Sequence, residues 1–193
     1  MRILDFRYIT KLDPFDDTYP HWSRKYEYPT VISEIKKRVG EFKDPPKIHN
    51  TSWGFDIEHH TKFKNDLEKE FFPHNVTNSD IIYNAVPNTC YHDITVPPNE
   101  NFKEAFDFVL NVSALEEIAG DHDYYLNNLY EQVRPGGYLI CTFDFPGLRL
   151  VDQDKLISQE NIQYKIWADA RQWGSVPELN VLLFVAQKDR YDN

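Results

Sequence analysis

Hydrophobic positions beyond residue 46 follow two alternating periods, one typical of strands and the other typical of amphipathic helices. Helices are predicted over Glu58–Phe72 and Asp121–Val133. Strands are predicted over 47–51, 76–80, 89–92, 106–112 and 138–143, with a last antiparallel pair near 162–168 and 179–187. Strands that alternate with helices are typical of an α/β protein with a largely parallel sheet, and antiparallel strands often form one edge of such a sheet.

The first 45 residues have a different texture, because four prolines, followed directly by Pro46, punctuate a stretch that is dense in Tyr, Trp and Asp. We expect loops there, followed by one helix. That helix is predicted from about Thr30 to Val39, with Pro29 just before it and Gly40 as its stop. We therefore divide the chain into an N-terminal arm, residues 1–45, and a main domain, residues 46–193.

Composition places the chain among soluble, globular proteins. Of its 193 residues, 41% are hydrophobic and 27% are charged, which is close to the average of folded domains. The net charge of −10 would repel phosphate backbones and so argues against nucleic acid as the main ligand. The sequence has neither an apolar run long enough for a membrane span nor the pattern of a signal peptide. We expect no membrane insertion and an intracellular, cytoplasmic location, which is the host cytoplasm if the source is viral.

The most specific stretch of sequence runs from Phe106 to Ile118 and predicts a buried strand that is followed by a turn and a helix. Further on, Arg134 to Gly137, with the sequence Arg-Pro-Gly-Gly, leads into the next strand. Proline cannot continue the preceding helix, and the two glycines are able to take positive φ before the strand begins. By itself this pattern indicates a generic βαβ unit, in which two parallel strands are joined through a helix.

This βαβ unit resembles the fourth and fifth strands of class I S-adenosylmethionine-dependent methyltransferases, and the resemblance covers about residues 46–188. It implies a Rossmann-like sheet, mostly parallel with an antiparallel C-terminal strand pair and helices on both faces, and S-adenosyl-L-methionine as the cofactor. Residues 48–55 and 111–118 look most like small glycan-modifying methyltransferases, including a domain fused to chlorella-virus glycosyltransferases. This narrower resemblance implies O-methylation of a sugar hydroxyl, such as one of rhamnose, and glycosyltransferases as fused or cooperating partners. The alternative is N-methylation of a small molecule or a protein.

The first motif of that family is an acidic residue followed by Gly-x-Gly-x-Gly, and this chain departs from it. Here the strand end reads Thr51-Ser52-Trp53-Gly54, with one of the seven glycines of the chain. S-adenosylmethionine has no pyrophosphate to cradle, so the glycine-rich requirement of dinucleotide sites is relaxed. We expect this loop to hold the aminocarboxyl end of the cofactor through hydrogen bonds. The alternative is a degenerate site in a non-catalytic binding domain of the same fold.

Other positions at predicted strand ends match the cofactor contacts of the family. Asp80 stands where the family places an acid that accepts hydrogen bonds from both ribose hydroxyls. Asp93 stands where an acid meets the adenine amino group, with Ile94 against the ring. Asn111 and Val112 would border the cofactor, since open α/β sheets bind ligands at the carboxyl ends of their strands. The alternatives are a solvated strand cap for Asp80 and a turn-initiating residue for Asp93.

Methyl transfer is an in-line displacement that needs a nucleophile held close to the methyl carbon. A sugar hydroxyl has a high pKa and gains from a general base, whereas an amine only has to be neutral. The candidates for that base are Glu116, Glu117, His122 and Asp144. Glu117 aligns with a position where many relatives carry histidine, and consecutive residues of a helix point about 100° apart, so we expect one glutamate to face the cleft. Both glutamates also suit a helix N-terminus electrostatically.

No metal site is predicted, because His59 and His60 are adjacent and do not present a zinc pair on one helix face. The alternative is a metal-assisted reaction, for which the hard ligands would be His122, Asp121, Asp123 and Asp144. Relatives commonly fold an N-terminal arm over the strand ends as a lid. The aromatic residues of the arm would then suit stacking against a carbohydrate, which is consistent with a glycan or small-molecule acceptor. The alternative is an arm that is packed for stability alone.

Overall fold

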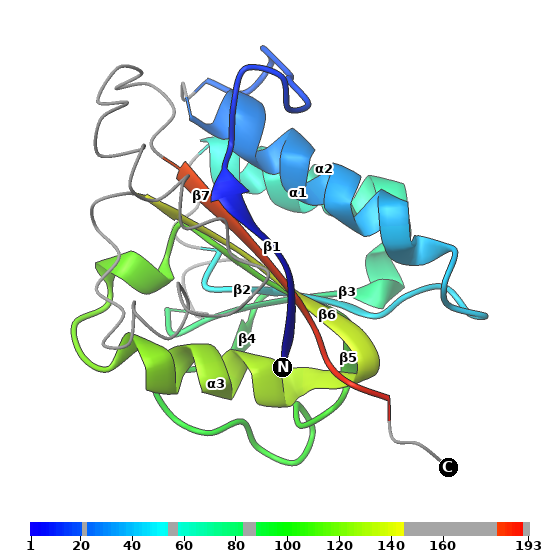
Figure 1. Cartoon of the computed structure of the whole chain (residues 1–193), viewed down its shortest axis with the longest axis vertical. Helices are drawn as coiled ribbons and strands as arrows, with labels where there is room; N and C mark the ends of the chain where they lie inside the picture. The colour runs from blue at the N-terminus through cyan, green and yellow to red at the C-terminus, as the bar shows by residue number, and fades with distance from the viewer. Residues whose placement is uncertain (21–22, 54–57, 83–87, 145–180, 191–193) are drawn as a thin grey trace.

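The computed structural model describes residues 1–20, 23–53, 58–82, 88–144 and 181–190. Within these residues one seven-stranded sheet has the order β1-β7-β6-β5-β2-β3-β4 (Figure 1). The strands are β1 (Arg2–Tyr8), β2 (Ile48–Thr51), β3 (Val76–Asp80), β4 (Cys90–Tyr91), β5 (Phe106–Val112), β6 (Val133–Asp144) and β7 (Val181–Gln187). The helices are α1 (Arg24–Val39), α2 (Glu58–Phe71) and α3 (His122–Gln132), with 3-10 turns η1 (Pro73–Asn75) and η3 (Leu115–Glu117).

The sheet is mostly parallel, with one antiparallel strand near its edge. Strands β6, β5, β2, β3 and β4 run parallel, and β7 is antiparallel to both of its neighbours, β6 and β1. Helices α1 and α2 lie on one face of the sheet and α3 lies on the other (Figure 1). The predicted fold class is therefore confirmed. The strand expected near 162–168 lies outside the described residues.

The central elements form where the sequence predicts them. Strands β3 and β5 have their predicted bounds, and α2 and α3 agree with theirs to within one residue at each end. Strand β7 is buried along its whole length and is almost entirely apolar, because it is covered on both faces. Strands β2 and β3 are also buried but mostly polar. Helix α3 starts cleanly because the side chain of Asp121 accepts a hydrogen bond from the backbone N–H of Tyr124 over 3.1 Å.

Residues 2–8 form a strand, which corrects the expectation of loops at the start of the arm. Strand β1 pairs antiparallel with β7 along its length (Figure 1). Its buried side chains, Ile3 and Phe6, are three residues apart, because Leu4 is an extra residue where the register shifts between Ile3 and Asp5. Such a bulge breaks the alternation of period two by which a strand is found in a sequence.

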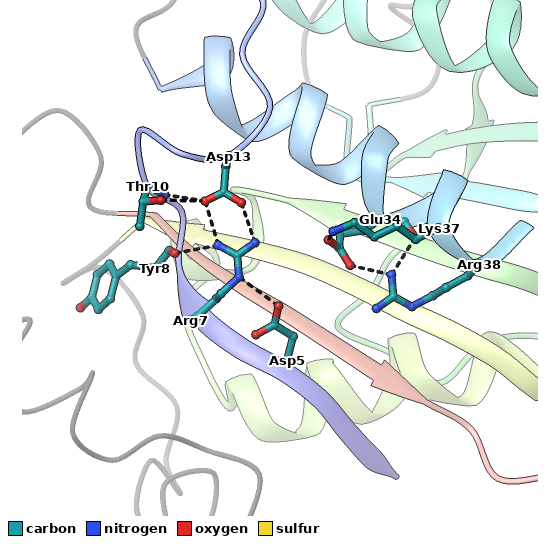
Figure 2. A network of polar contacts seen from close by, with 8 residues as sticks. All are labelled: Asp5, Arg7, Tyr8, Thr10, Asp13, Glu34, Lys37 and Arg38. Atoms are coloured by element: carbon teal, nitrogen blue, oxygen red, sulfur yellow. Dashed lines mark hydrogen bonds and ion pairs between the residues drawn. The ribbon is translucent and has the colours of Figure 1, made fainter.

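An ion-pair network fixes the turn that follows β1 (Figure 2). Arg7 donates hydrogen bonds of 2.8 and 2.6 Å to the carboxylate of Asp13 and one of 3.0 Å to Asp5. The backbone N–H and the hydroxyl of Thr10 donate to the same Asp13 carboxylate. Burial acts to raise the pKa of Asp13, but the hydrogen bonds from Arg7 and Thr10 outweigh it and lower that pKa. The turn after β1 is thus held to the strand by charge-assisted bonds, and the strand itself is held in the sheet by its pairing with β7.

Helix α1 begins at Arg24 rather than at Thr30, and it therefore contains Pro29. Proline has no N–H, so the carbonyl four residues earlier, that of Lys25, loses its partner within the helix. The backbone N–H of Asp16 donates to that carbonyl over 2.8 Å. The arm supplies from outside the helix the hydrogen bond that proline removes, which explains why Pro29 is tolerated inside α1 instead of preceding it.

Strand β6 starts at Val133, earlier than predicted, so the Arg-Pro-Gly-Gly stretch is an irregular part of the strand and not a separate turn. Gly136 has a φ of +82°, the left-handed region that glycine adopts readily. A Cβ atom on Gly137 would lie 2.7 Å from the backbone oxygen of Asp107. The two glycines are therefore needed for different reasons, one for its backbone angle and the other for close approach to β5.

Two apolar clusters fill the space between the sheet and its helices. Successive residues of β5 and β6 point to opposite faces, so Leu110 and Ile140 join the cluster under α1 and α2, whereas Val109 and Leu139 join the cluster under α3. The sheet therefore lies between two layers of helices, and the loops lie at the two ends of the strands. Every helix in the described part of the chain is too short or too polar to cross a membrane.

Candidate functional site

A cleft of about 440 Å³ opens at the carboxyl ends of β2, β3, β4 and β5. The chain passes from β2 outward to β3 and β4, whereas β5 lies on the other side of β2. Open α/β sheets bind ligands at such a reversal, because the loops that follow the two adjacent strands diverge there. The described lining residues are Tyr28, Asn50, Thr51, Ser52, Trp53, His60, Phe63, Asp80, Ile81, Ile82, His92, Asp93, Ile94, Thr95, Val112, Ser113, Ala114, Glu117 and Ile118.

The loop after β2 forms the start of the cleft wall. Three of the predicted cofactor residues, Thr51, Ser52 and Trp53, line the cleft. Trp53 is buried, and its indole N–H donates to the hydroxyl of Thr89 over 3.0 Å, which fixes the ring against the segment that leads into β4. Gly54, the single glycine of this loop, lies outside the described residues.

Asn111 lies beneath the cleft and stabilises its floor through side-chain hydrogen bonds. Its side-chain amide donates to the hydroxyl of Thr51 over 3.1 Å, and its side-chain oxygen accepts the backbone N–H of Leu115 over 3.1 Å. The Thr51 hydroxyl in turn donates to the carbonyl of Leu110 over 2.8 Å. The side chain of Asn111 is fully buried and ties β2, β5 and η3 together, while the next residue, Val112, lines the cleft.

The backbone turns sharply at the ends of both central strands. Thr51 and Asn111 are register partners in neighbouring strands, and the residue after each has positive φ, +51° for Ser52 and +44° for Ser113. Such a conformation costs a non-glycine residue about 1–3 kcal/mol, and it persists mainly where the surrounding structure enforces it, often at ligand sites. Two serines therefore adopt, at the floor of the cleft, a conformation that glycine adopts more easily.

Asp80 lies in the cleft at the end of β3, between the residues that lead out of the strand. Its side chain is 6% exposed, and its Oδ1 accepts the backbone N–H of Ile82 over 3.0 Å. Ile81 and Ile82 line the cleft beside it. The carboxylate is thus held in one orientation next to an apolar surface.

Asp93 initiates a turn and also borders the cleft, while its role toward adenine stays a prediction. Its Oδ1 accepts the backbone N–H of Thr95 over 2.9 Å and the Thr95 hydroxyl over 2.6 Å, so it does initiate a turn. It also lines the cleft, together with the buried side chain of Ile94. The amide of Asn128, from α3, donates to the carbonyl of Ile94 over 3.1 Å and so fixes this segment.

Two stacked histidines, His49 and His92, lie beside the part of the cleft that Asp93 lines. His49 bonds through Nδ1 to the Gln132 side-chain oxygen and through Nε2 to the Ser79 hydroxyl, both over 2.7 Å. The ring of His92, which lines the cleft, stacks on His49 with the ring centres 5.2 Å apart. Burial lowers the pKa of both histidines, that of His49 strongly. Both rings are therefore neutral at physiological pH.

The four base candidates are placed differently. Glu117 is exposed and lines the cleft from η3. Glu116 is buried and is not among the residues that line the cleft. Burial raises the pKa of the Cys141 thiol, and the charge of Glu116 adds to that shift. His122 is buried, and its Nε2 lies 2.6 Å from the carbonyl of Ile118. The side chain of Asp144, at the end of β6, lies outside the described part of the structure.

Glu27 of α1 is a buried carboxylate at the cleft rim that sequence reasoning missed. It is fully buried, and its Oε1 accepts hydrogen bonds from the hydroxyls of Ser113, over 2.5 Å, and Thr142. Its Oε2 pairs with Arg24, one turn earlier in the helix. Glu27 thereby fastens the arm to the ends of β5 and β6.

The arm also supplies part of the cleft wall. Tyr28 of α1 lines the cleft and stacks on Phe63 of α2, with the ring centres 4.2 Å apart and the planes 11° from parallel. The N-terminal part of α1 therefore lies beside the cleft, while a lid function of the arm stays a prediction.

Comparison with known proteins finds no matching family model and no matching curated protein. Among solved structures, the CMeT domain of the citrinin polyketide synthase is 15% identical, with a TM-score of 0.55 over 88% of this chain and 52% of that one. The DszA carbon methyltransferase is 12% identical, with a TM-score of 0.54 over 88% and 54%. A SAM-dependent methyltransferase from Archaeoglobus fulgidus is 12% identical, with a TM-score of 0.51 over 83% and 94%.

The chain spans about half the length of the first two of these structures. At such low identity the likeness concerns the fold, and it shows that this chain has the fold of class I methyltransferases. The cleft described above stands at the strand ends where that fold places its ligand.

Proposed function

We propose that the chain is an S-adenosylmethionine-dependent methyltransferase and that it acts on a sugar hydroxyl. The observation that carries the proposal is the convergence of Asp80, Asp93 and the loop after β2 in one cleft, at the point where the strand order reverses. These three features come from separate strand ends, and their meeting in a single cavity is what a cofactor with ribose, adenine and aminocarboxyl parts requires.

The size and the donor set of the cleft fit this cofactor. A volume of about 440 Å³ falls within the range of about 300–1,000 Å³ that is usual for small-molecule sites. A carboxylate accepts two hydroxyl hydrogen bonds at once, so we assign Asp80, at the end of β3 in the cleft, to the two ribose hydroxyls. Oδ2 of Asp93 makes no hydrogen bond within the described residues, and we assign it to the adenine amino group, with Ile94 against the ring.

Bound S-adenosylmethionine supplies a methyl group on a sulfonium, where the carbon is open to attack by a nucleophile. The residues of this chain position the acceptor and keep water out. Tyr28, Phe63 and Trp53 give the cleft an apolar wall. The carboxylate of Glu117, at the open side of the cleft, accepts the proton that an attacking hydroxyl loses.

A sugar hydroxyl as the acceptor is supported by two features. The sequence of residues 111–118 resembles glycan-modifying methyltransferases, and the same residues form the part of the cleft wall that carries Glu117. A carboxylate beside the acceptor is useful for a hydroxyl, which must be deprotonated, and unnecessary for a neutral amine. The stacked pair of Tyr28 and Phe63 adds an aromatic surface of the kind that carbohydrates pack against.

Titration calorimetry of the full chain with S-adenosylmethionine tests the cofactor assignment. We expect saturable binding, and Asp80→Asn should weaken it about 10-fold or more, because hydrogen bonds to a charged group are worth about 1.5–3 kcal/mol. Asp17→Asn, at an exposed position of the arm, is the matched control and should bind as the unchanged chain does. Absence of binding at high micromolar cofactor would overturn the proposal.

A further inference from the structure

A second cavity, of about 810 Å³, lies on the side of the sheet opposite to the cleft, where the parallel strands begin. It is formed where β1 begins, where β7 ends and where α1 ends, with Tyr138 of β6 between them. Arg2 and Tyr138 are both register partners of Gln187, so the three strands meet here side by side. We call it the amino-edge groove, because β6 and the strands parallel to it start at this edge. Its lining residues are Arg2, Leu4, Lys37, Arg38, Glu41, Tyr138, Gln187, Lys188, Asp189 and Arg190.

The groove is strongly basic in a chain that is acidic as a whole. Half of its lining residues are lysine or arginine, against 21 of 193 in the whole sequence, which is about one in nine. Glu41 and Asp189 are the two carboxylates among the described lining residues. The field in the groove is thus of opposite sign to that expected from the net charge of −10, and it favours a small anion.

Three arginines of the groove keep N–H donors available. Arg190 makes no hydrogen bond or ion pair with any described residue, and Arg2 donates to the neutral side chain of Gln187. Arg38 uses its Nη1 for Glu34 and has no partner for Nε and Nη2 among the described residues. A guanidinium presents five donors in a planar fork, so each of these groups is able to bind a further acceptor.

The basic end of α1 explains only part of this surface. Lys37 and Arg38 stand in the last turn of the helix, where cations are favoured by its dipole, and both pair with the buried carboxylate of Glu34 (Figure 2). Arg2 and Arg190 belong to different segments, at opposite ends of the chain, and no helix end accounts for them. Their meeting beside Arg38 is a product of the β1–β7 pairing.

The floor of the groove is polar and already ordered. The hydroxyl of Tyr138 accepts a hydrogen bond from the side-chain amide of Gln187 over 2.8 Å and donates one to Glu41 over 2.6 Å. Arg38 lies over the Tyr138 ring, 5.3 Å from its centre, which leaves the guanidinium edge open. Burial and the bond to Glu41 raise the pKa of Tyr138 to about 12, so the hydroxyl stays neutral. Arg38 is thereby held against an ordered floor, which lowers the entropic cost of binding a ligand at this residue.

We propose that the amino-edge groove binds a small molecule that carries linked phosphate groups, with Arg2, Arg38 and Arg190 as its ligands. Guanidinium forks match phosphate oxygens in a bidentate geometry, and three forks from three segments suit more than one phosphate. A small ligand is favoured over nucleic acid, because the acidic remainder of the chain repels an extended polyanion. This site does not depend on the function proposed for the cleft.

Calorimetric titration of the full chain with inorganic pyrophosphate, at constant ionic strength, tests the proposal. We expect saturable one-to-one binding that is at least 10-fold tighter than that of sulfate. Arg190→Gln and Arg2→Gln should each weaken it about 10-fold, since each removes a charge-assisted contact. Arg190→Gln should leave the unfolding midpoint unchanged, because Arg190 holds no described residue in place. Lys11→Gln removes an exposed charge at the turn after β1 and should bind pyrophosphate normally.

Two results would overturn the proposal. The first is binding that does not saturate, is no tighter than that of sulfate, or falls equally in Lys11→Gln, since any of these indicates unspecific attraction of anions. The second is retention by vesicles containing about 20% phosphatidylserine that is lost in Arg190→Gln, without any binding of pyrophosphate. That pattern would identify the groove as a membrane-facing surface instead.

Discussion

Glu117 is the base candidate whose side chain the described structure places in the cleft, and its replacement tests the assigned role at the scale of one residue. Glu117→Gln keeps the size of the side chain and, at an exposed position, should leave the fold intact. It removes the proton acceptor, so we expect turnover to fall about 10²- to 10⁴-fold with unchanged affinity for S-adenosylmethionine. Release of S-adenosylhomocysteine, with methyl rhamnoside as the acceptor, measures the first quantity and calorimetry the second.

Glu100→Gln is the control for that experiment, because Glu100 is equally exposed and does not line the cleft. It should turn over as the unchanged chain does. Turnover of Glu117→Gln within about twofold of normal would contradict a general-base role. It would favour an acceptor, such as an amine, that attacks without losing its proton first.

Single site residues could be predicted where a strand end alone locates them. Asp80 and Asp93 each follow a predicted strand and match a position of the family that the chain resembles. The structure brings both into one cleft, while their roles stay predictions. Glu27 could not be found, because it is defined by Ser113, which is 86 residues away in the sequence, and by the fold that brings them together. His49 gave a weak signal, since a histidine within a short buried strand is unusual and needs polar partners.

At the scale of elements, the periodicity of hydrophobic residues predicts the central strands and helices. It does not predict β1 or the start of α1, where the local structure is irregular. Strand β1 was missed because the bulge at Leu4 puts its buried side chains three residues apart. The start of α1 was misjudged because Pro29 is a common first residue of a helix, and the compensating bond from Asp16 is a tertiary contact. Neither exception is encoded in a short sequence window.

The irregular start of β6 predicts that replacing Gly137 by alanine destabilises the fold. In Gly137→Ala the new methyl group would lie 2.7 Å from the backbone oxygen of Asp107, and backbone of two paired strands cannot move away cheaply. We expect a loss of about 1–3 kcal/mol in the free energy of unfolding, as for other overpacked sites. Urea unfolding, followed by circular dichroism, measures it.

Gly40→Ala is the matched control, at the end of α1. Gly40 has a φ of −67°, and a Cβ there would meet nothing within 4 Å. The substitution should therefore be neutral or should stabilise by up to about 1 kcal/mol, since alanine loses less chain entropy on folding. Equal losses for both variants would show that the close approach of Gly137 to β5 is not what demands glycine.

At the scale of the whole molecule, the sequence predicts the class of sheet better than its edges. The central strands are recognisable as parallel because helices separate them, whereas the pairing of β1 with β7 joins the two ends of the chain. The amino-edge groove follows from that pairing, since Arg2 and Arg190 meet there. The net charge of −10 does not indicate this groove, because a net charge averages over surfaces of opposite sign.

The buried histidines make the stability of the whole fold depend on pH in a defined window. Burial lowers the pKa of His49 and of His92 in the folded state, whereas in the unfolded chain both titrate near 6.5. Below pH 6.5 the unfolded state therefore binds more protons, so this stability is present above that pH and is lost as the pH falls toward the folded values. Carboxylates with lowered pKa, such as Asp13 and Glu34, act separately and only below about pH 4.5.

We therefore expect the free energy of unfolding in urea to fall from pH 7.5 to pH 5.5, with a slope of up to about 1.4 kcal/mol per pH unit for each histidine that stays neutral. His74→Gln, at an exposed position, should keep this slope, whereas replacing His49 and His92 together by Gln should flatten it. If the double variant does not fold, nuclear magnetic resonance of the unchanged protein tests the prediction through the pH titration of its histidine ring signals. His49 should remain neutral at pH 5.5, because protonating it would place a charge between Gln132 and Ser79 with no carboxylate among its hydrogen-bond partners, and His92 should titrate below pH 6.5. Titration of every histidine near pH 6.5 would contradict the prediction.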